Sequence, residues 1–197
     1  MEPLRENKLL SYADYLALPK SERWELLEGR PYAMSGASLA HQQLCRDLSV
    51  ALVQHFRGSR CQVLFAPLDV RLSEHDVVQP DVMVVCDRSQ LKPTYIDGPP
   101  ALVVEIASPS SLRHDRLRKF RLYAAAGVGE YWIFYPDRPL AEVYWLDGEG
   151  YRAHGVYSEK ETLLSPTFPD LSLPLEGLLP PAEVDEVREG IPPYTTA

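Results

Sequence analysis

The order of apolar segments in the second half of the chain constrains the fold more than any other feature. Three segments rich in β-forming residues, around 61–72, 77–86 and 101–107, are separated by turn signals at 73–76 and 93–100. A helical pattern then runs from near 110 to 127, and a strand-like segment covers 130–135. This order predicts an α/β fold in which a mixed sheet is flanked by helices. The crossover from the strand at 101–107 to the strand at 130–135 should be right-handed and parallel.

The rest of the chain completes an αβββαβ core. A short amphipathic helix should open at Ser11, and a hairpin should turn at Glu28-Gly29. Apolar residues recur at helical spacing from Ser38 to about Phe56, which predicts a long helix. Alternating residues after 135 predict an extra C-terminal β-hairpin that turns at Asp147-Gly148.

Composition limits the class of protein. The 197 residues are 45% hydrophobic and 24% charged, as in a globular protein, and we expect one domain over 1–180 with an acidic, proline-bearing tail over 181–197. No segment approaches the roughly 18 apolar residues that span a bilayer, and the N-terminus has no signal-peptide core. We therefore expect a cytoplasmic protein without a membrane partner. Its cysteines, Cys45, Cys61 and Cys86, should be free thiols.

The charge distribution excludes some functions. A formal net charge of -8 argues against a protein whose whole surface binds nucleic acid. The segment 113–121, "RHDRLRKFR", is strongly basic, with Asp115 as its one acid, so contact with a polyanion should be local. Replacing Arg116 and Arg118 should weaken such contact. No P-loop, GxSxG elbow or GxGxxG fingerprint occurs, which leaves P-loop nucleotide hydrolysis, serine hydrolase chemistry and dinucleotide binding unsupported.

Two carboxylates interrupt strand-like apolar segments. In "ALVVEIA", Glu105 alternates onto the same face as Val103 and Ala107, and Asp81 lies in "VVQPDVMVV" after Pro80, which cannot donate a ladder hydrogen bond. If the two strands are neighbours about 4.8 Å apart, the carboxylates can converge. Two desolvated anions repel unless a cation separates them, and Mg²⁺ binds one or two protein carboxylates. The alternative is a solvated face of an antiparallel sheet.

The helix that follows Glu105 should bring the positively charged side chain of Lys119 back beside Glu105. About 16 Å of extended chain leads from Glu105 to Ser110, and about 13 Å of helix leads back to Lys119. Lys119 could then orient an attacking water or stabilise negative charge in a transition state. The alternative is an ion pair with Asp115 on a solvated helix face.

The segments "QPDV", "VVEIASPSS" and "RLRKFRLYAAAGVGEYWIF" resemble the Uma-type restriction endonucleases, a branch of the PD-(D/E)XK nuclease superfamily. The resemblance covers most of residues 10–175 and implies Mg²⁺-dependent cleavage of DNA phosphodiester bonds. By position, Asp81 is the motif aspartate and Glu105 the second acid. The lysine that the superfamily places two residues after Glu105 is Ala107 here, and the resemblance moves its role to Lys119.

Two further residues match the pattern of this family, and each has two possible roles. Glu28 would be an additional acid near the metal, or a solvated glutamate in a hairpin turn. His41 would join the site, or would be an exposed polar residue in the first turn of a helix.

Together with the two acids and Lys119, this resemblance implies a metal-dependent endonuclease. One or two Mg²⁺ ions, or Mn²⁺ in their place, are expected on Asp81, Glu105 and the backbone carbonyl of Ile106, with Lys119 assisting catalysis. Removal of Lys119 should abolish most cleavage and leave thermal stability nearly intact. DNA is the expected partner, and the chain is expected to form a homo-oligomer, a dimer by default. The alternatives are a catalytically inactive nucleic-acid-binding module with a nuclease fold and a purely structural dimer domain.

Overall fold

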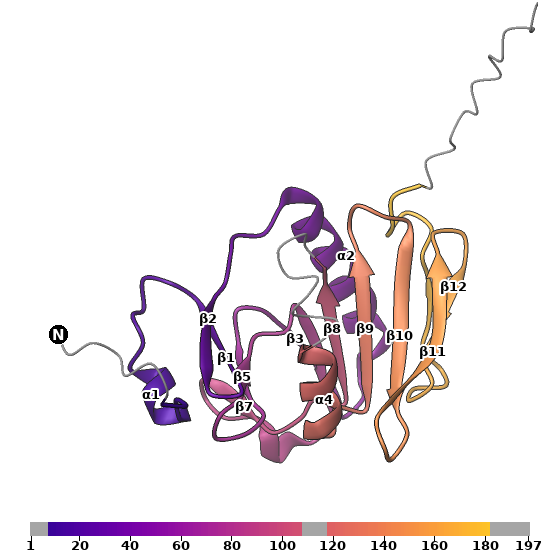
Figure 1. The fold of residues 1–197 in the computed structure, drawn as a ribbon. Helices are drawn as coiled ribbons and strands as arrows, with labels where there is room; N and C mark the ends of the chain where they lie inside the picture. The colour runs from indigo at the N-terminus through magenta and orange to yellow at the C-terminus, as the bar shows by residue number, and fades with distance from the viewer. Residues whose placement is uncertain (1–7, 108–117, 182–197) are drawn as a thin grey trace, which may run out of the picture.

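A computed structural model describes residues 8–107 and 118–181 (Figure 1). Its α-helices are α1 (Tyr12–Leu16), α2 (Leu39–His55) and α4 (Phe120–Ala126), with a short 3₁₀ helix at Arg88–Gln90. The strands up to the middle of the chain are β1 (Trp24–Leu27), β2 (Arg30–Ala33), β3 (Gln62–Phe65), β4 (Asp69–Arg71), β5 (Val77–Val78), β6 (Val82–Val85) and β7 (Tyr95–Asp97). The later strands are β8 (Leu102–Ile106), β9 (Glu130–Tyr135), β10 (Leu140–Leu146), β11 (Tyr151–Ser158), β12 (Thr162–Leu164) and β13 (Ser172–Pro174).

The strands form two main sheets. A six-stranded sheet has the order β11-β10-β9-β8-β6-β3, and a five-stranded sheet has the order β2-β1-β5-β4-β7. Within the six-stranded sheet β8 and β9 are parallel, whereas β8 and β6 are antiparallel. The predicted α/β class and the parallel pairing are confirmed, and β6, which follows Asp81, is a neighbour of β8, which contains Glu105. Asp81 itself was expected within a strand, but it lies in the bend before β6. The division into two sheets was not predicted.

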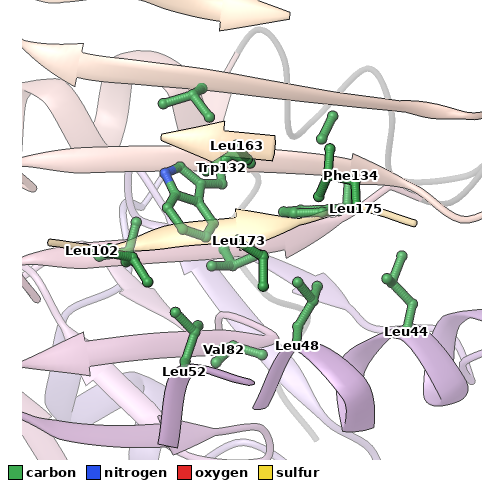
Figure 2. Close-up of a cluster of buried hydrophobic side chains, with 14 of the residues drawn as sticks. Leu44, Leu48, Leu52, Val82, Leu102, Trp132, Phe134, Leu163, Leu173 and Leu175 are labelled. Atoms are coloured by element: carbon green, nitrogen blue, oxygen red, sulfur yellow. The ribbon is translucent and has the colours of Figure 1, made fainter. Parts of the chain in front are cut away.

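Helices pack against both faces of the six-stranded sheet. Leu44, Leu48 and Leu52 of α2 bury against residues of one face that include Val82 and Leu102 (Figure 2). Tyr123 of α4 lies in a second cluster with Met83 and Val103, which alternate onto the opposite face. Figure 1 accordingly shows α2 and α4 on either side of β8 and β9.

Local signals set the ends of several elements as expected. Ser11 caps α1 in a capping box with Asp14, and the Oγ atom of Ser38 accepts a hydrogen bond from the His41 N–H at the start of α2. The β1–β2 hairpin turns at Glu28 and Gly29, both at positive φ. Gly127 ends α4 in the left-handed conformation. The start of the predicted helix, with Asp115 and Arg116, lies outside the described residues.

Three predictions about the middle of the chain were wrong. The segment 61–72 divides into β3 and β4, and 77–86 divides into β5 and β6, because the chain passes from one sheet to the other between the members of each pair. The predicted turn at 93–100 contains β7, which pairs in parallel with β4. Cys61 and Cys86 are joined by a disulfide rather than free, because the β3–β6 register brings the two residues opposite each other.

Two further features concern the helices and the C-terminal region. Among residues 8–107 and 118–181, no helix combines the length and apolarity that a membrane crossing needs. The strands β12 and β13, which were not predicted, pair antiparallel and contribute Leu163 and Leu173 to the cluster around α2. The expected tail at 182–197 lies outside the described residues.

Candidate active site

Glu105 is buried near the end of β8, with 4% of its surface exposed. Its Oε1 atom accepts hydrogen bonds from the Tyr123 hydroxyl at 2.6 Å and from the Lys119 ammonium at 2.9 Å. Both donors come from α4 and the residue before it, so Lys119 lies beside Glu105 as the sequence analysis expected. Burial, followed by the negative charges of Glu105 and Glu25, raises the pKa of Tyr123 well above its ordinary value. Tyr123 therefore stays protonated and continues to donate to Glu105.

Lys119 lies between two carboxylates. Its Nζ atom is 2.8 Å from Oε1 of Glu25 and 2.9 Å from Oε1 of Glu105, and only 4% of the residue is exposed. A buried ammonium is stable when it is paired and hydrogen-bonded, and two carboxylates at this distance provide both. The alternative of a lysine on a solvated helix face is therefore wrong, although Asp115 itself lies outside the described residues.

Asp81 lies in the bend between β5 and β6, where the chain crosses from one sheet to the other. Its Oδ2 atom accepts a hydrogen bond from the backbone N–H of Ile106 at 2.8 Å and lies 3.2 Å from Nε2 of His41. The residue directly after Glu105 thus holds Asp81 close to Glu105. Pro80 fits this position, because a residue between two sheets needs no ladder hydrogen bond.

Glu25 is the site residue that the sequence analysis missed. It lies in β1, is 6% exposed, and accepts a hydrogen bond from the backbone N–H of Gln79 as well as from Lys119. The signal was available, because Glu25 is a single acid inside the apolar segment "WELL", the same feature that drew attention to Glu105. Glu28, the acid that was considered instead, is exposed in the hairpin turn and does not line the cavity.

These side chains line an open cavity of about 1290 Å³. Asp81, Glu105, Lys119, Glu25 and His41 form its polar end. One face of α2, between Ser38 and Arg57, forms a wall together with the end of β3 at Phe65. Such a volume exceeds the roughly 300–1,000 Å³ of ordinary small-molecule sites. The cavity is therefore large enough for a ligand bigger than a typical small molecule.

The donor set at the polar end suits a hard divalent cation. Asp81 and Glu105 supply carboxylate oxygens, and Ile106 lines the cavity beside them. The described residues contain no group of three or more His, Cys, Asp or Glu side chains arranged to hold a metal. Mg²⁺ does not require one, because it commonly binds one or two protein carboxylates and completes its shell with water and phosphate oxygens. Three carboxylates against the ammonium of Lys119 also leave this end of the cavity negative.

Asp81 affects one more group in the cavity. The Sγ atom of Cys45 lies 3.7 Å from the backbone oxygen of Asp81. Burial, and then the negative charge of Asp81, raises the pKa of the Cys45 thiol. The thiol is therefore held in its neutral form and is a poor nucleophile at neutral pH.

Comparison with known proteins identifies the fold and the family of this chain. The chain is similar over 86% of its length, with a TM-score of 0.71 and 18% identity, to 97% of the crystallised chain of a "putative nuclease belonging to DUF820" from Anabaena variabilis. It is 36% identical over 118 residues to the uncharacterized protein slr1290 of Synechocystis sp. and 28% identical over 125 residues to the uncharacterized protein sll1609 of the same organism.

These two alignments cover 58% and 59% of this chain, and 62% and 68% of the respective relatives. The family model described as "Uma2: Putative restriction endonuclease" matches residues 12–176, which include every residue of the site. The chain therefore belongs to the Uma2 family.

Proposed function

We propose that this protein is a metal-dependent endonuclease that hydrolyses DNA phosphodiester bonds. The observation that carries the proposal is the contact of the buried Lys119 with Glu105, beside Asp81, at the end of an open cavity. An acid pair with an adjacent lysine provides the two functions that phosphodiester hydrolysis needs, which are cation binding and charge stabilisation. Membership of the Uma2 family supports the same reaction.

Asp81 and Glu105 would hold Mg²⁺, or Mn²⁺ in its place, together with the backbone carbonyl of Ile106. When bound, the cation would polarise the scissile phosphate and lower the pKa of a water molecule. The carboxylates need support to keep this arrangement. Tyr123 donates to Glu105, and the Ile106 N–H donates to Asp81, so both acids are oriented by groups of the protein.

Lys119 would stabilise the negative charge that develops on the phosphate oxygens, as an ammonium fixed in a poorly solvated site does effectively. Glu25 would keep Lys119 in place, because it contacts the ammonium at 2.8 Å from β1 of the other sheet. Water would add to phosphorus while the bond to the leaving oxygen breaks; the attacking water would release one proton to solvent, and the leaving oxygen would take one up from solvent.

A catalytically inactive nucleic-acid-binding module is the second candidate. It is favoured by one observation, that the Lys119 ammonium already compensates the charge of Glu105 and Glu25. Such a module would still bind nucleic acid through exposed basic residues such as Arg118 and Arg121.

We also expect a dimer, which light scattering of the purified protein would test.

A cleavage assay separates the two candidates. Supercoiled plasmid and single-stranded DNA would be incubated with the protein in Mg²⁺, in Mn²⁺ and in EDTA. The endonuclease predicts nicked or linear products with either metal and none with EDTA. The inactive module predicts retarded but intact DNA under all three conditions.

A further inference from the structure

The Asp81 carboxylate is contacted from two sides by parts of the chain that are far apart in the sequence. The Ile106 N–H in β8 donates to Oδ2 at 2.8 Å, and Nε2 of His41 in α2 lies 3.2 Å from the same oxygen. In the described part of the chain Oδ1 accepts no hydrogen bond. Both protein contacts therefore fall on one carboxylate oxygen and leave the other for a ligand.

Asp81 needs such contacts because its own backbone does not fix its side chain. The residue follows Pro80 in a bend between β5 and β6 and belongs to neither strand. A strand residue has its side-chain direction set by the pleat, but a bend residue does not. The orientation of the Asp81 carboxylate therefore depends on its hydrogen-bond partners.

His41 is well placed to give this support. It lies in the first turn of α2, where its backbone N–H donates to the Oγ atom of the capping residue Ser38. The helix is anchored on the sheet by Leu44 and Leu48, and the His41 side chain is only 12% exposed. An imidazole on such a rigid support holds a neighbouring carboxylate more firmly than a side chain on a loop would.

We infer that His41 is a positioning residue for the metal centre: its Nε2–H and the Ile106 N–H together fix Oδ2 of Asp81, so that Oδ1 is presented to the cation. This inference rests on the proposed function, which requires that cation. In this role the ring nitrogen carries the hydrogen, because a carboxylate oxygen only accepts, and the 3.2 Å separation of Nε2 and Oδ2 allows such a contact. The opposing possibility is that His41 is itself a ligand, and an imidazole favours Mn²⁺ and later transition metals over Mg²⁺.

Calorimetric titration of the metal-free protein with MgCl₂ and with MnCl₂ tests the inference without relying on cleavage. His41→Leu should lower the affinity for both ions, by about 10-fold or more, as removal of a group that orients a metal ligand does. His41→Gln should bind both ions nearly as wild type does, because its amide nitrogen can donate from about the position of Nε2. His41→Asn, whose amide is one carbon shorter, should bind as weakly as His41→Leu.

His55→Leu is the matched control, since His55 is an exposed histidine at the far end of the same helix. It should bind both ions as wild type does. Thermal unfolding of the metal-free variants would show whether each is folded, and the Gln and Asn variants decide the question if the Leu variant is not.

Several results would overturn the inference. Wild-type affinity in both His41→Leu and His41→Asn would show that the contact does not support the site. A decrease in Mn²⁺ affinity alone would make His41 a ligand. Equal weakening in His41→Gln and His41→Leu would contradict a role through the Nε2–H. The proposed function fails separately, if the wild-type protein binds neither ion or if Asp81→Asn binds both ions as tightly as wild type.

Discussion

The Nζ atom of Lys119 lies 2.9 Å from Oε1 of Glu105, and both residues are almost completely buried. From the sequence, a cation is expected between Glu105 and Asp81, but the Lys119 ammonium compensates the charges of Glu105 and Glu25. The site thus contains a buried ion-pair cluster from β1, β8 and the residue before α4. Asp81 approaches it through the neighbouring backbone of Ile106.

This burial changes the expected effect of removing Lys119. The sequence predicted a lysine beside the carboxylates whose removal leaves thermal stability nearly intact. Lys119→Met instead leaves Glu25 and Glu105 buried without their cation, which should lower the free energy of unfolding by about 3–5 kcal/mol. Urea unfolding at neutral pH in EDTA measures this. The exposed lysine Lys160 supplies the control Lys160→Met, which should unfold as wild type does, and an equally stable Lys119→Met would contradict the described ion pairs.

Divalent metal should partly replace the missing ammonium in the same variant. Removal of Lys119 frees Glu105 from its ion pair, so Mg²⁺ should stabilise Lys119→Met more than it stabilises wild type. Cleavage should nevertheless fall on the order of 10²-fold or more, because the group that stabilises developing charge is gone. The midpoint of thermal unfolding with and without Mg²⁺ measures the first effect, and equal shifts in both proteins would disprove competition for Glu105.

Glu25 and Glu28 form a matched pair for mutation. Glu25→Gln keeps the shape of a side chain that contacts Lys119 and the Gln79 N–H but removes its charge, so cleavage should fall on the order of 10-fold or more. Glu28→Gln changes an exposed turn residue outside the cavity and should cleave at the wild-type rate. Steady-state cleavage by the two variants shows whether Glu25 or Glu28 is the additional acid of the site. Slower cleavage by Glu28→Gln than by Glu25→Gln would identify Glu28 as that acid.

Arg118 and Arg121 are the exposed basic residues of the segment 113–121 that the structure describes. If they bind phosphates, replacing both with glutamine should weaken DNA binding and reduce the slope of log K against log salt by about 0.9 for each phosphate that is no longer neutralised. Fluorescence anisotropy at several salt concentrations measures this. Arg152→Gln, at an exposed position on β11 beside Asp147, is the control. An unchanged slope in the double variant would place the phosphate-binding residues elsewhere.

The disulfide should contribute to stability. Cys61 and Cys86 are 25 residues apart, and a crosslink over such a loop stabilises a fold by about 3 kcal/mol when it restricts the unfolded chain. Reduction, or replacement of both cysteines with alanine, should lower the free energy of unfolding by about this amount. Cys45→Ala should leave the effect of the reducing agent unchanged. If the reducing agent has no effect on wild type, the cysteines are free thiols, as the sequence alone predicts.

Much of the fold was predictable because it depends on local patterns. Alternation in "ALVVEIA" correctly placed Val103 and Val104 on opposite faces of the sheet. Lys119 does lie at Glu105, as expected, although most of the returning helix on which that expectation depended lies outside the described residues. These predictions depend only on the repeat distances of strands and helices, which vary little between proteins.

The missed features depend on contacts between distant segments. Nothing near Pro80 in the sequence tells whether the chain continues in one sheet or crosses to another, and it crosses. Glu25 joins the site because the two sheets bring β1 close to the residue before α4, a relation that no spacing in the sequence records. The pairing of Cys61 with Cys86 likewise follows from the register of β3 on β6.

The most direct test of the central claim compares plasmid cleavage by wild type and Glu105→Gln in Mg²⁺, with both proteins purified in the same way. Glutamine keeps the size of the side chain and can still accept from Tyr123, but it lacks the charge that a divalent cation requires. The account predicts that wild type cleaves the plasmid and that Glu105→Gln is slower by on the order of 10²-fold or more. Equal cleavage by the two proteins, or no cleavage by wild type with either Mg²⁺ or Mn²⁺, would contradict it.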